Sequence, residues 1–321
     1  MNAPLAFLNG RFLPFREAAL PLHDAGFTFG ATIVDNARTF RHKLFRWPDH
    51  LARFRGDCES CYVPLESSDE QLTAVAEELI SHNAKLLPPG GELQLVTFAT
   101  PGPLGMYLGE ETNGPPTFGM HTYPLPFARY RRFFTEGVNL AFAGVEHSNQ
   151  FDLVPPRAKH RSRIHWHVAE KTINNPKSAR YSPGGTPVVL NQEGFGDTAI
   201  GSILIVGRDV VIRPIGKEIL DSISVKVVNE LCEAIGIRMD QAAIDLAPLS
   251  RPLQSSEMKS LYDLPTLELL LTGTGFGLAG VRRFTNGEHF RDYPWPGPAY
   301  RKLLAAWSDL VGVDIEKQFT S

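Results

Sequence analysis

The sequence predicts an α+β protein with two domains, a small N-terminal one and a larger C-terminal one. Its 321 residues leave room for two substantial hydrophobic cores. Residues 1–123 combine strand-like segments with two helices, and a new series of strands starts near residue 135. Between them, PLPFARYRRFF at residues 124–134 carries two prolines and basic aromatics, which suit an interdomain connector better than an element interior. We therefore expect domains at 1–123 and 135–321.

The first domain opens with a hairpin, because LAFLNGRFLPF places an Asn-Gly pair between two apolar runs. Strands are expected over residues 33–40 and 43–46, followed by a helix that Pro48 begins. A longer helix, with apolar positions that include Leu72 and Ile80, must stop at LPPGG. The segments ELQLVTFAT and PPTFGMHTYPL then indicate two more strands.

The second domain alternates strands with a few helices. Its expected strands are GVNLAFAGV, TPVVLNQ, SILIVGRDVVIRP, ELLLTGTG and VRRF. The segment IHWHVAEKTINN has helical texture, and a helix over residues 223–235 places Val228, Leu231 and Cys232 on one face. An Asn-Gly turn precedes the C-terminal helix over residues 299–310.

Composition excludes several classes of function. Charged residues make up 21% of the chain and the net charge is −3, so there is no excess of positive charge for nucleic acid. The start MNAPLAFLNGRFLPF lacks a basic, then apolar leader, and no membrane-length apolar run occurs, which predicts a cytoplasmic protein without a membrane partner. The odd count of three cysteines fits a reducing compartment. Cys58 and Cys61 lack further zinc ligands at similar spacing, so we expect buried helical cysteines and no metal.

A basic stretch, PPRAKHRSRIHWHVAEKT at residues 155–172, stands out against this acidic balance. Such cations most often form a solvated face. His165 and His167 could hold a metal only on a strand, and the segment has helical texture. The third interpretation is a reactive amine at Lys159, because nearby cations favour a neutral, nucleophilic lysine. Three arginines could act in this way: Arg157, Arg161 and Arg163.

Three other segments could bind a phosphate group. The DSIS segment at residues 221–224 starts a helix, where free N–H groups favour a dianion, although plain N-capping by Ser222 or Ser224 explains it as well. LTGTG at residues 271–275 ends an apolar strand in a hydroxyl-bearing turn, or in a loop that simply needs glycine. Arg53 could make a bidentate phosphate contact or be an ordinary surface arginine.

In this order, the segments resemble the fold-type IV pyridoxal-phosphate enzymes, which include branched-chain aminotransferases, D-amino-acid transaminases and aminodeoxychorismate lyase. The resemblance runs from about residue 7 to the C-terminal helix. The segments that carry it are HDAGFTFGATIVDNARTF with Asp35 and Arg38, HLAR, the lysine segment, NQEGFGDTAIGSILIV, ILDSIS, LTGTGFG, VRRFTNGEHF and GPAYRKLLAAW. It implies a small α/β N-terminal domain, a larger domain with a β-barrel-like core and flanking helices, and a homodimer with active sites between the domains.

The resemblance also implies roles for individual residues. Lys159 would form the internal aldimine with pyridoxal 5′-phosphate and move the proton between the α-carbon and the cofactor. Glu193 would face the pyridine nitrogen and keep it protonated, so that the ring accepts electrons. The cofactor phosphate would be bound by Arg53, by the backbone of Ile223 and Ser224, and by Thr274.

Three departures from the family concern mainly the substrate. Ile164 stands where a tyrosine is common, Val96 where branched-chain enzymes place an arginine, and Thr198 where asparagine is usual. A substrate carboxylate would therefore need another cation, with Gly275 in the LTGTG turn as a further expected contact. The candidate cations are Arg161, Arg163, Arg129, Arg131 and, with a structural alternative, Arg38.

Three functions remain open from the sequence. The leading one is an aminotransferase that transfers an amino group between an amino acid and a 2-oxo acid in two half-reactions. The second is a lyase of the aminodeoxychorismate lyase type, although Asp35 and Asn36 stand where that enzyme resembles paired threonines. The third is a cofactor-binding homologue without turnover. The sequence does not name the donor, the acceptor or the preferred stereochemistry.

Overall fold

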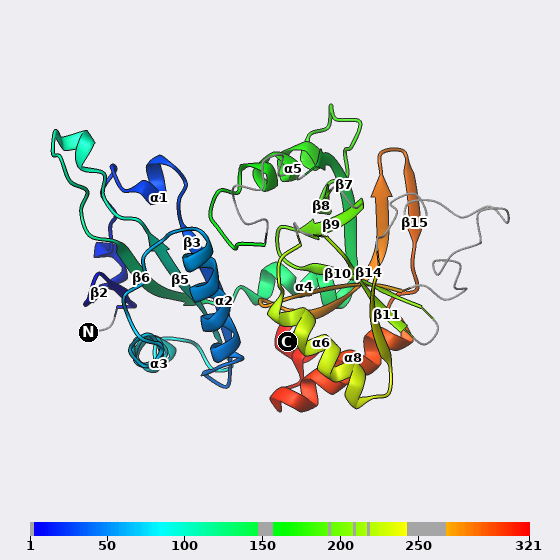
Figure 1. Cartoon of the computed structure of the whole chain (residues 1–321). Helices are drawn as coiled ribbons and strands as arrows, with labels where there is room; N and C mark the ends of the chain where they lie inside the picture. The colour runs from blue at the N-terminus through cyan, green and yellow to red at the C-terminus, as the bar shows by residue number, and fades with distance from the viewer. Residues whose placement is uncertain (1–2, 147–156, 192–193, 208–209, 217–218, 243–267) are drawn as a thin grey trace. The chain divides into compact units, whose positions relative to one another are not determined.

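The computed structural model describes residues 3–146, 157–191, 194–207, 210–216, 219–242 and 268–321 (Figure 1). The chain forms two compact units. One contains Met1–Leu125 with Asp152–Arg163, and the other contains Pro126–Phe151 with Ile164–Ser321. The segment that carries Lys159 thus packs with the first unit, although its sequence neighbours on both sides belong to the second. The predicted domain limits at 123 and 135 did not anticipate this return of the chain.

The first unit is built on a six-stranded sheet in which all neighbouring strands are antiparallel, in the order β2-β1-β6-β5-β3-β4. Its strands are β1 (Leu5–Leu8), β2 (Arg11–Pro14), β3 (Ile33–Phe40), β4 (Lys43–Leu44), β5 (Leu93–Thr100) and β6 (Thr117–Pro124). Asn9 and Gly10 both have positive φ, as the expected two-residue hairpin turn requires.

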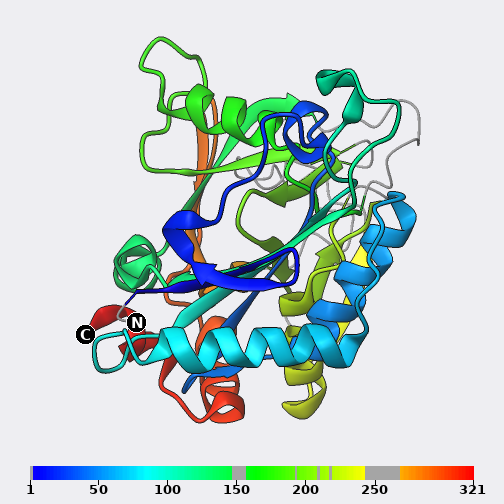
Figure 2. The same cartoon turned by 90° about the vertical axis from the view of Figure 1, so that its left-hand side faces the viewer.

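Two helices cover one face of this sheet, α2 (Trp47–Ser60) and α3 (Asp69–Ala84), the long blue and cyan helices of Figure 2. Leu51 of α2 and Leu79 of α3 pack with Leu95 and Met120 of the sheet in one buried cluster. Side chains alternate along a strand, so the opposite face of β3, β5 and β6 carries a different set of residues. The unit also contains α1 (Ala25–Thr28) and two short 3-10 turns, η1 (Phe15–Glu17) and η2 (Gly105–Leu108).

The second unit contains a nine-stranded mixed sheet that curls into a half-barrel. The main path is β12-β11-β10-β13-β14-β7-β8-β9, and β15 pairs with β14. Three pairs are parallel, β11 with β12, β14 with β7, and β7 with β8. The strands are β7 (Val138–Glu146), β8 (Thr186–Asn191), β9 (Gly194–Thr198), β10 (Ser202–Val206), β11 (Val210–Pro214), β12 (Arg238–Ala242), β13 (Glu268–Gly273), β14 (Gly277–Asn286) and β15 (His289–Asp292).

Helices pack on this sheet through apolar faces. Ala169 and Ile173 of α5 (Ile164–Asn174) join Ala141, Ala143 and Val189 in one buried cluster. The helix α6 (Ile223–Ala234) buries Val227, Val228, Leu231 and Cys232, as its periodicity predicts. The described residues of this unit also form α4 (Phe127–Thr135), α8 (Pro298–Val311) and α9 (Ile315–Thr320). The α+β class with a small N-terminal part and a barrel-like larger part is therefore confirmed.

The predicted connector at residues 124–134 is mostly the helix α4. The two prolines of this segment precede the helix, where they remove no helical hydrogen bond. Tyr130 and Phe134 of the helix are buried. The ring of Phe134 stacks on that of Phe319 in α9, with centroids 4.5 Å apart. This contact between residues far apart in sequence, together with the apolar face, explains why the segment is helical. None of the helices in the part of the chain that the structure describes is long and apolar enough to span a membrane.

Candidate active site

The segment around Lys159 lies along the beginning of β3 like a short extra strand. The carbonyl of Lys159 accepts the N–H of Val34 at 2.8 Å, and the N–H of Arg161 donates to the carbonyl of Thr32 at 2.9 Å. His160 pairs with Ile33 between them. Backbone bonds on both sides of His160 therefore fix the position of the lysine on this sheet edge.

Close packing beside β3 holds the end of this segment. The hydroxyl of Ser162 donates to the carbonyl of Gly30 at 2.8 Å. Gly30 has a φ of +66°, and a Cβ at this position would lie 2.6 Å from the Ser162 oxygen. Glycine suits position 30 because its backbone is left-handed, and a larger residue would also displace the Ser162 hydroxyl from its hydrogen bond.

Arg53 is held by a buried carboxylate. Its Nε–H donates to Oδ2 of Asp35 at 2.8 Å, while Nδ1 of His50 lies 2.7 Å from Oδ1 of the same side chain. Asp35 is only 2% exposed. Burial alone would raise the pKa of Asp35, but Arg53 and His50 outweigh it and hold that pKa well below the ordinary value. Asp35 is thus a permanent anion that orients Arg53 from β3.

Lys159 is close enough to these groups for its acidity to change. Burial, then the positive charge of Arg53, and then Arg163 and Arg161 lower the pKa of its amine to about 8, while Asp35 opposes the shift. At pH 7 roughly a tenth of such an amine is neutral, hundreds of times more than of an ordinary lysine. The first unit therefore combines an activated amine with a firmly oriented arginine.

Arg161 is exposed and Arg163 is half-buried, and the protein atoms around them lower the pKa of both guanidinium groups by desolvation. Within the described residues, no carboxylate forms an ion pair with Arg161, whose charge acts on Tyr123 and His121. His121 on β6 stands directly opposite Val96 on β5. Its Nδ1 is buried and has no hydrogen-bond partner in the described part of the chain.

Sequence reasoning missed His121. The alternation of β6 could have placed it on the same face as Tyr123, opposite the face that α3 covers, but its proximity to Arg161 depends on how the lysine segment docks. Burial, helped by Arg161, lowers the pKa of His121, so the ring is neutral at neutral pH.

The other proposed arginines have structural surroundings. Arg38 is 1% exposed, donates to the carbonyl of Thr39 and lies over the ring of Phe40 at 3.9 Å. Arg131, an exposed residue of α4 in the second unit, donates to the oxygen of the last residue, Ser321. Arg129 lies near the ring of Tyr130 on the same helix. Ile164, which stands where the family commonly has a tyrosine, is 72% exposed at the start of α5.

The second unit carries the predicted phosphate contacts at the start of α6. Ser222 is the N-cap, and its hydroxyl accepts the N–H of Val225 at 3.4 Å. Ile223 and Ser224 follow in the first turn, are both buried, and their N–H groups have no partner within the helix. The capping interpretation of Ser222 is thus correct, and it leaves these backbone donors available for an anion.

Thr274 and Gly275 lie in the turn between β13 and β14. A Cβ at Gly275 would lie 3.0 Å from the Tyr130 hydroxyl, so a larger residue would need Tyr130 of α4 to shift slightly. Thr198 closes a different turn: its hydroxyl donates to the carbonyl of Gly201 at 2.6 Å and accepts the N–H of Gly201 at 2.9 Å. Glu193 lies outside the described residues.

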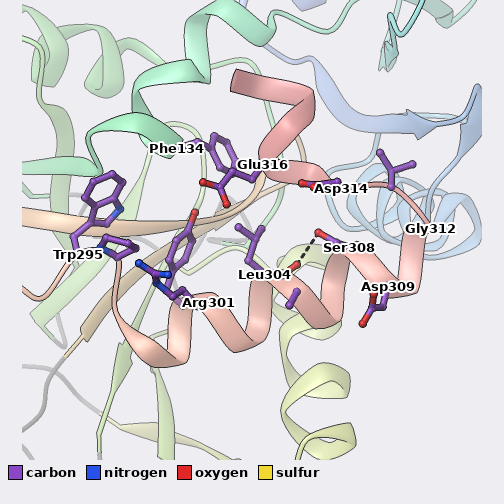
Figure 3. Close-up of a pocket in the computed structure, with 13 residues that line it drawn as sticks. Phe134, Trp295, Arg301, Leu304, Ser308, Asp309, Gly312, Asp314 and Glu316 are labelled. Atoms are coloured by element: carbon purple, nitrogen blue, oxygen red, sulfur yellow. Dashed lines mark hydrogen bonds between the residues drawn. The ribbon is translucent and has the colours of Figure 1, made fainter. Parts of the chain in front are cut away.

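A separate cavity of about 800 Å³ opens between α8 and α9 (Figure 3). Arg301, Glu316 and Trp295 are among the residues that line it. Among the described residues, neither the predicted site residues nor a lysine belongs to its lining.

The structure thus gathers the predicted residues in two groups. Arg53, Lys159, Arg161 and Arg163 belong to the first unit, and Ile223, Ser224, Thr274 and Gly275 belong to the second. Their assembly around one cofactor stays a prediction.

Comparison with known proteins agrees with the fold and with the order of the segments. The family model described as amino-transferase class IV matches residues 32–284. A Methanocaldococcus jannaschii protein provisionally assigned as a branched-chain-amino-acid aminotransferase is 23% identical over 279 residues, 86% of each chain. D-alanine aminotransferase of Staphylococcus aureus is 32% identical over 77 residues, which is 24% of this chain and 27% of that one.

Solved structures show the same fold over nearly the whole chain. Branched-chain amino acid aminotransferase of Escherichia coli superposes with a TM-score of 0.76 at 15% identity, covering 96% of this chain and 95% of that one. A hypothetical aminotransferase of Mycobacterium tuberculosis in a form bound to α-ketoglutarate and PMP gives 0.75 at 16% identity, covering 96% and 99%. The branched-chain aminotransferase of Thermoproteus uzoniensis with norvaline gives 0.74 at 18% identity, covering 98% and 96%.

Proposed function

Because the chain belongs to the amino-transferase class IV family, we propose that it is a pyridoxal-phosphate-dependent aminotransferase acting on an amino acid and a 2-oxo acid, with Lys159 as its catalytic lysine. The observation that carries this proposal is the Lys159 amine, which is held at the start of β3 and whose pKa burial and then Arg53 lower to about 8. An ordinary lysine has no reason to lie in a cluster of three arginines on a sheet edge, whereas a nucleophilic one needs such surroundings.

The donor set fits the cofactor. Arg53 presents a cation that Asp35 orients, and the first turn of α6 presents the backbone donors of Ile223 and Ser224, with Thr274 in the turn after β13. Cations, hydroxyls and helix N-termini are the groups that bind phosphate dianions in proteins. When bound, pyridoxal 5′-phosphate supplies an electron sink for the charge left at the substrate α-carbon.

Lys159 would then serve twice. Its neutral amine would hold the cofactor, and the same amine would accept and return the proton at the substrate α-carbon. Both tasks need a lysine that loses its proton near neutral pH, which burial and Arg53 provide.

For the substrate carboxylate we propose Arg161, with Arg163 beside it. Among the described residues Arg161 has no carboxylate partner, and its charge acts on His121, which stands opposite Val96, the position where the family arginine is missing. Arg38, Arg129 and Arg131 have other contacts in the structure. We expect Arg161→Ala to raise KM for the substrate whose carboxylate it binds about tenfold or more, since a charge-assisted hydrogen bond contributes about 1.5–3 kcal/mol.

Borohydride trapping tests the function. Wild-type protein loaded with pyridoxal 5′-phosphate is reduced with borohydride, digested, and searched by mass spectrometry for the pyridoxyl mass on the Lys159 peptide. Lys159→Ala should lose that label, while Lys171→Ala, an exposed lysine of the same basic stretch, should keep it. A panel of L- and D-amino donors with 2-oxo acids then measures turnover. Absence of the label on wild-type Lys159 would refute the proposal, and a label without turnover on any donor would favour a binding protein.

A further inference from the structure

Asp57 reaches from α2 to the backbone of the proposed catalytic lysine. The N–H of Lys159 donates to Oδ2 of Asp57 at 2.9 Å, across 102 positions of sequence. The aspartate is partly buried, and burial is the main cause that raises its pKa, against the opposing effects of the Lys159 N–H and Arg53. Burying a carboxylate costs more free energy than a neutral acceptor would, and a neutral acceptor could also bind one backbone N–H. Satisfying the Lys159 N–H therefore does not by itself explain why residue 57 is an aspartate.

The position of Asp57 on α2 suggests a second reason. Arg53 and Asp57 are four residues apart, so they project from the same face of the helix, one turn from each other. Arg53 is locked to Asp35, and Asp57 is bonded to Lys159. One helical turn therefore sets the position of the arginine relative to the lysine.

We propose that Asp57 is a positioning residue of the candidate active site, which fixes the Lys159 backbone relative to Arg53. Only the purpose of this positioning, to place Lys159 for catalysis, rests on the proposed function. The hydrogen bond acts beside the backbone bonds that Lys159 and Arg161 make to Val34 and Thr32, and it ties the lysine to the helix as well as to the sheet. Charge-assisted hydrogen bonds of this kind are about twice as strong as neutral ones, which suits a clamp.

The charge of Asp57 also acts on the amine. The charges of Arg53, Asp35 and Lys159 act on Asp57, and Asp57 in turn acts on the thiols of Cys58 and Cys61. The groups facing the Lys159 amine include Arg53, Asp35, Arg163 and Arg161. When the negative charge of Asp57 is removed, the positive charges of the arginines act on the Lys159 amine with less compensation. The ammonium form of Lys159 then becomes less favourable, so its pKa should fall further below its present value of about 8.

Two substitutions separate the geometric effect from the electrostatic one. Asp57→Asn keeps an oxygen acceptor of the same size and removes the charge, whereas Asp57→Ala removes both. Glu59→Gln is the matched control, because it removes the same charge from an exposed side chain of the same helix. All variants are studied without cofactor, so that the result does not depend on the reaction.

The first measurement is amide hydrogen exchange at Lys159 by mass spectrometry. We expect exchange about tenfold faster in Asp57→Ala, which corresponds to losing one hydrogen bond, and a change of less than about threefold in Asp57→Asn. The second is the pH dependence of acylation of the Lys159 amine. Both Asp57 variants should react as if the lysine pKa were lower, and Glu59→Gln should react like the wild type.

Three results would overturn the inference: unchanged exchange at Lys159 in Asp57→Ala, unchanged acylation in Asp57→Asn, or an equal shift in Glu59→Gln. If Asp57→Ala does not fold, comparing the acylation of Lys159 in Asp57→Asn with that in Glu59→Gln still tests the inference. These outcomes are independent of borohydride trapping. Failure of wild-type Lys159 to take the label would remove the proposed function, while a measured loss of protection in Asp57→Ala would still stand.

Discussion

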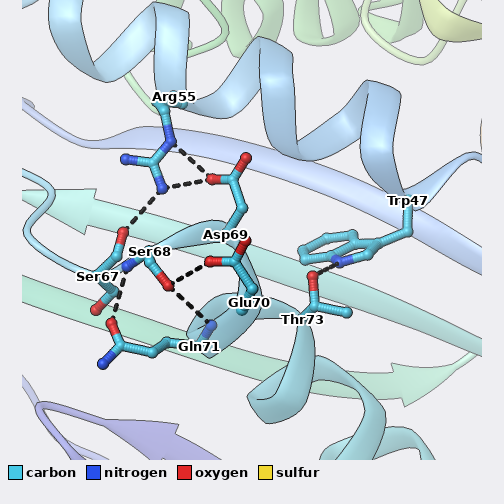
Figure 4. Close-up of polar contacts among 8 residues, drawn as sticks. All are labelled: Trp47, Arg55, Ser67, Ser68, Asp69, Glu70, Gln71 and Thr73. Atoms are coloured by element: carbon cyan, nitrogen blue, oxygen red, sulfur yellow. Dashed lines mark hydrogen bonds and ion pairs between the residues drawn. The ribbon is translucent and has the colours of Figure 1, made fainter.

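Two arginines on α2 form ion pairs of similar length in different surroundings. Arg53 lies 2.8 Å from Asp35, and the two side chains are 7% and 2% exposed. Arg55 lies 2.6 Å from Asp69, and those side chains are 36% and 56% exposed (Figure 4). The shorter pair, Arg55–Asp69, contributes less to stability, because water screens its charges and competes for both partners. Distance alone therefore does not rank the two contacts; burial does.

The two pairs also serve different ends. Arg53 is oriented by Asp35 and in turn lowers the pKa of Lys159, so the buried pair belongs to the candidate site. Arg55 also donates to the carbonyl of Ser67 at 2.8 Å, immediately before the N-cap Ser68 of α3, so the exposed pair only helps to hold two helices together.

The largest effect should come from Arg53→Ala. It leaves Asp35 charged and buried with His50 as its remaining partner, and breaking a buried pair in this way costs about 3–5 kcal/mol. Urea unfolding of the cofactor-free protein, followed by hydrogen exchange in peptides of α2 and β3, measures this loss. Cofactor affinity should fall as well. A cost below about 1 kcal/mol would place Arg53 in the same class as Arg55 and end the distinction.

Asp35→Asn should cost about 3 kcal/mol near neutral pH, because Arg53 then loses its counter-charge. The pKa of Asp35 is lower in the folded state, so its contribution is present above the unfolded pKa of about 3.9 and is lost as pH falls below that value. The stability difference between wild type and variant should therefore shrink on acidification from pH 5 downwards. Denaturation curves at several pH values test this, and a constant difference would contradict it.

Ser68→Ala removes a cap beside the exposed pair. The Ser68 hydroxyl accepts the N–H of Gln71 at 3.3 Å, and the Gln71 side chain accepts the N–H of Ser68 at 2.8 Å (Figure 4). Losing such a capping box costs about 1 kcal/mol. Hydrogen exchange at the first turn of α3 should accelerate accordingly, with exchange in β7 of the second unit as the internal control. A larger loss than that of Arg53→Ala would reverse the expected order.

Arg55→Ala should have the smallest effect, about 0.5 kcal/mol, since exposed pairs contribute little. That contribution should fall further in about 0.5 M salt, where screening is strong, whereas the cost of Arg53→Ala should hardly change. Parallel urea titrations at low and high salt would show the contrast. Equal salt sensitivity of the two variants would mean that Arg53 is no better shielded than Arg55.

The fold was largely predictable because the local patterns agree with the tertiary structure. The Asn9-Gly10 hairpin, β3, α2, β5, β6, α6 and α8 lie where periodicity and turn residues predicted them. The helix α4 was not predicted, because two prolines precede it and argued for a connector. Its apolar face is stabilised by Phe319, which is far away in sequence.

The candidate site residues were named from the family resemblance, and their roles stay predictions; their surroundings could not be predicted. Nothing in the sequence shows that Lys159 docks on β3 or that Asp57 and Asp35 act on the same pair of cations, because these contacts span many residues. One local sign existed: Arg53 and Asp57 are four residues apart on a predicted helix. For His121, the alternation of β6 indicates only which face of the sheet it lies on, and its place opposite Val96 depends on the register of β5 and β6.

The return of residues 152–163 to the first unit has a consequence for dissecting the protein. The chain passes between the two units at 125/126, at 151/152 and again at 163/164, so no single cleavage separates them. A fragment that ends at Leu125 would leave the start of β3 without its neighbouring segment and Asp57 without the amide it binds. The first unit is one folded body formed by two stretches of the chain, and the shorter stretch carries Lys159, the proposed catalytic lysine.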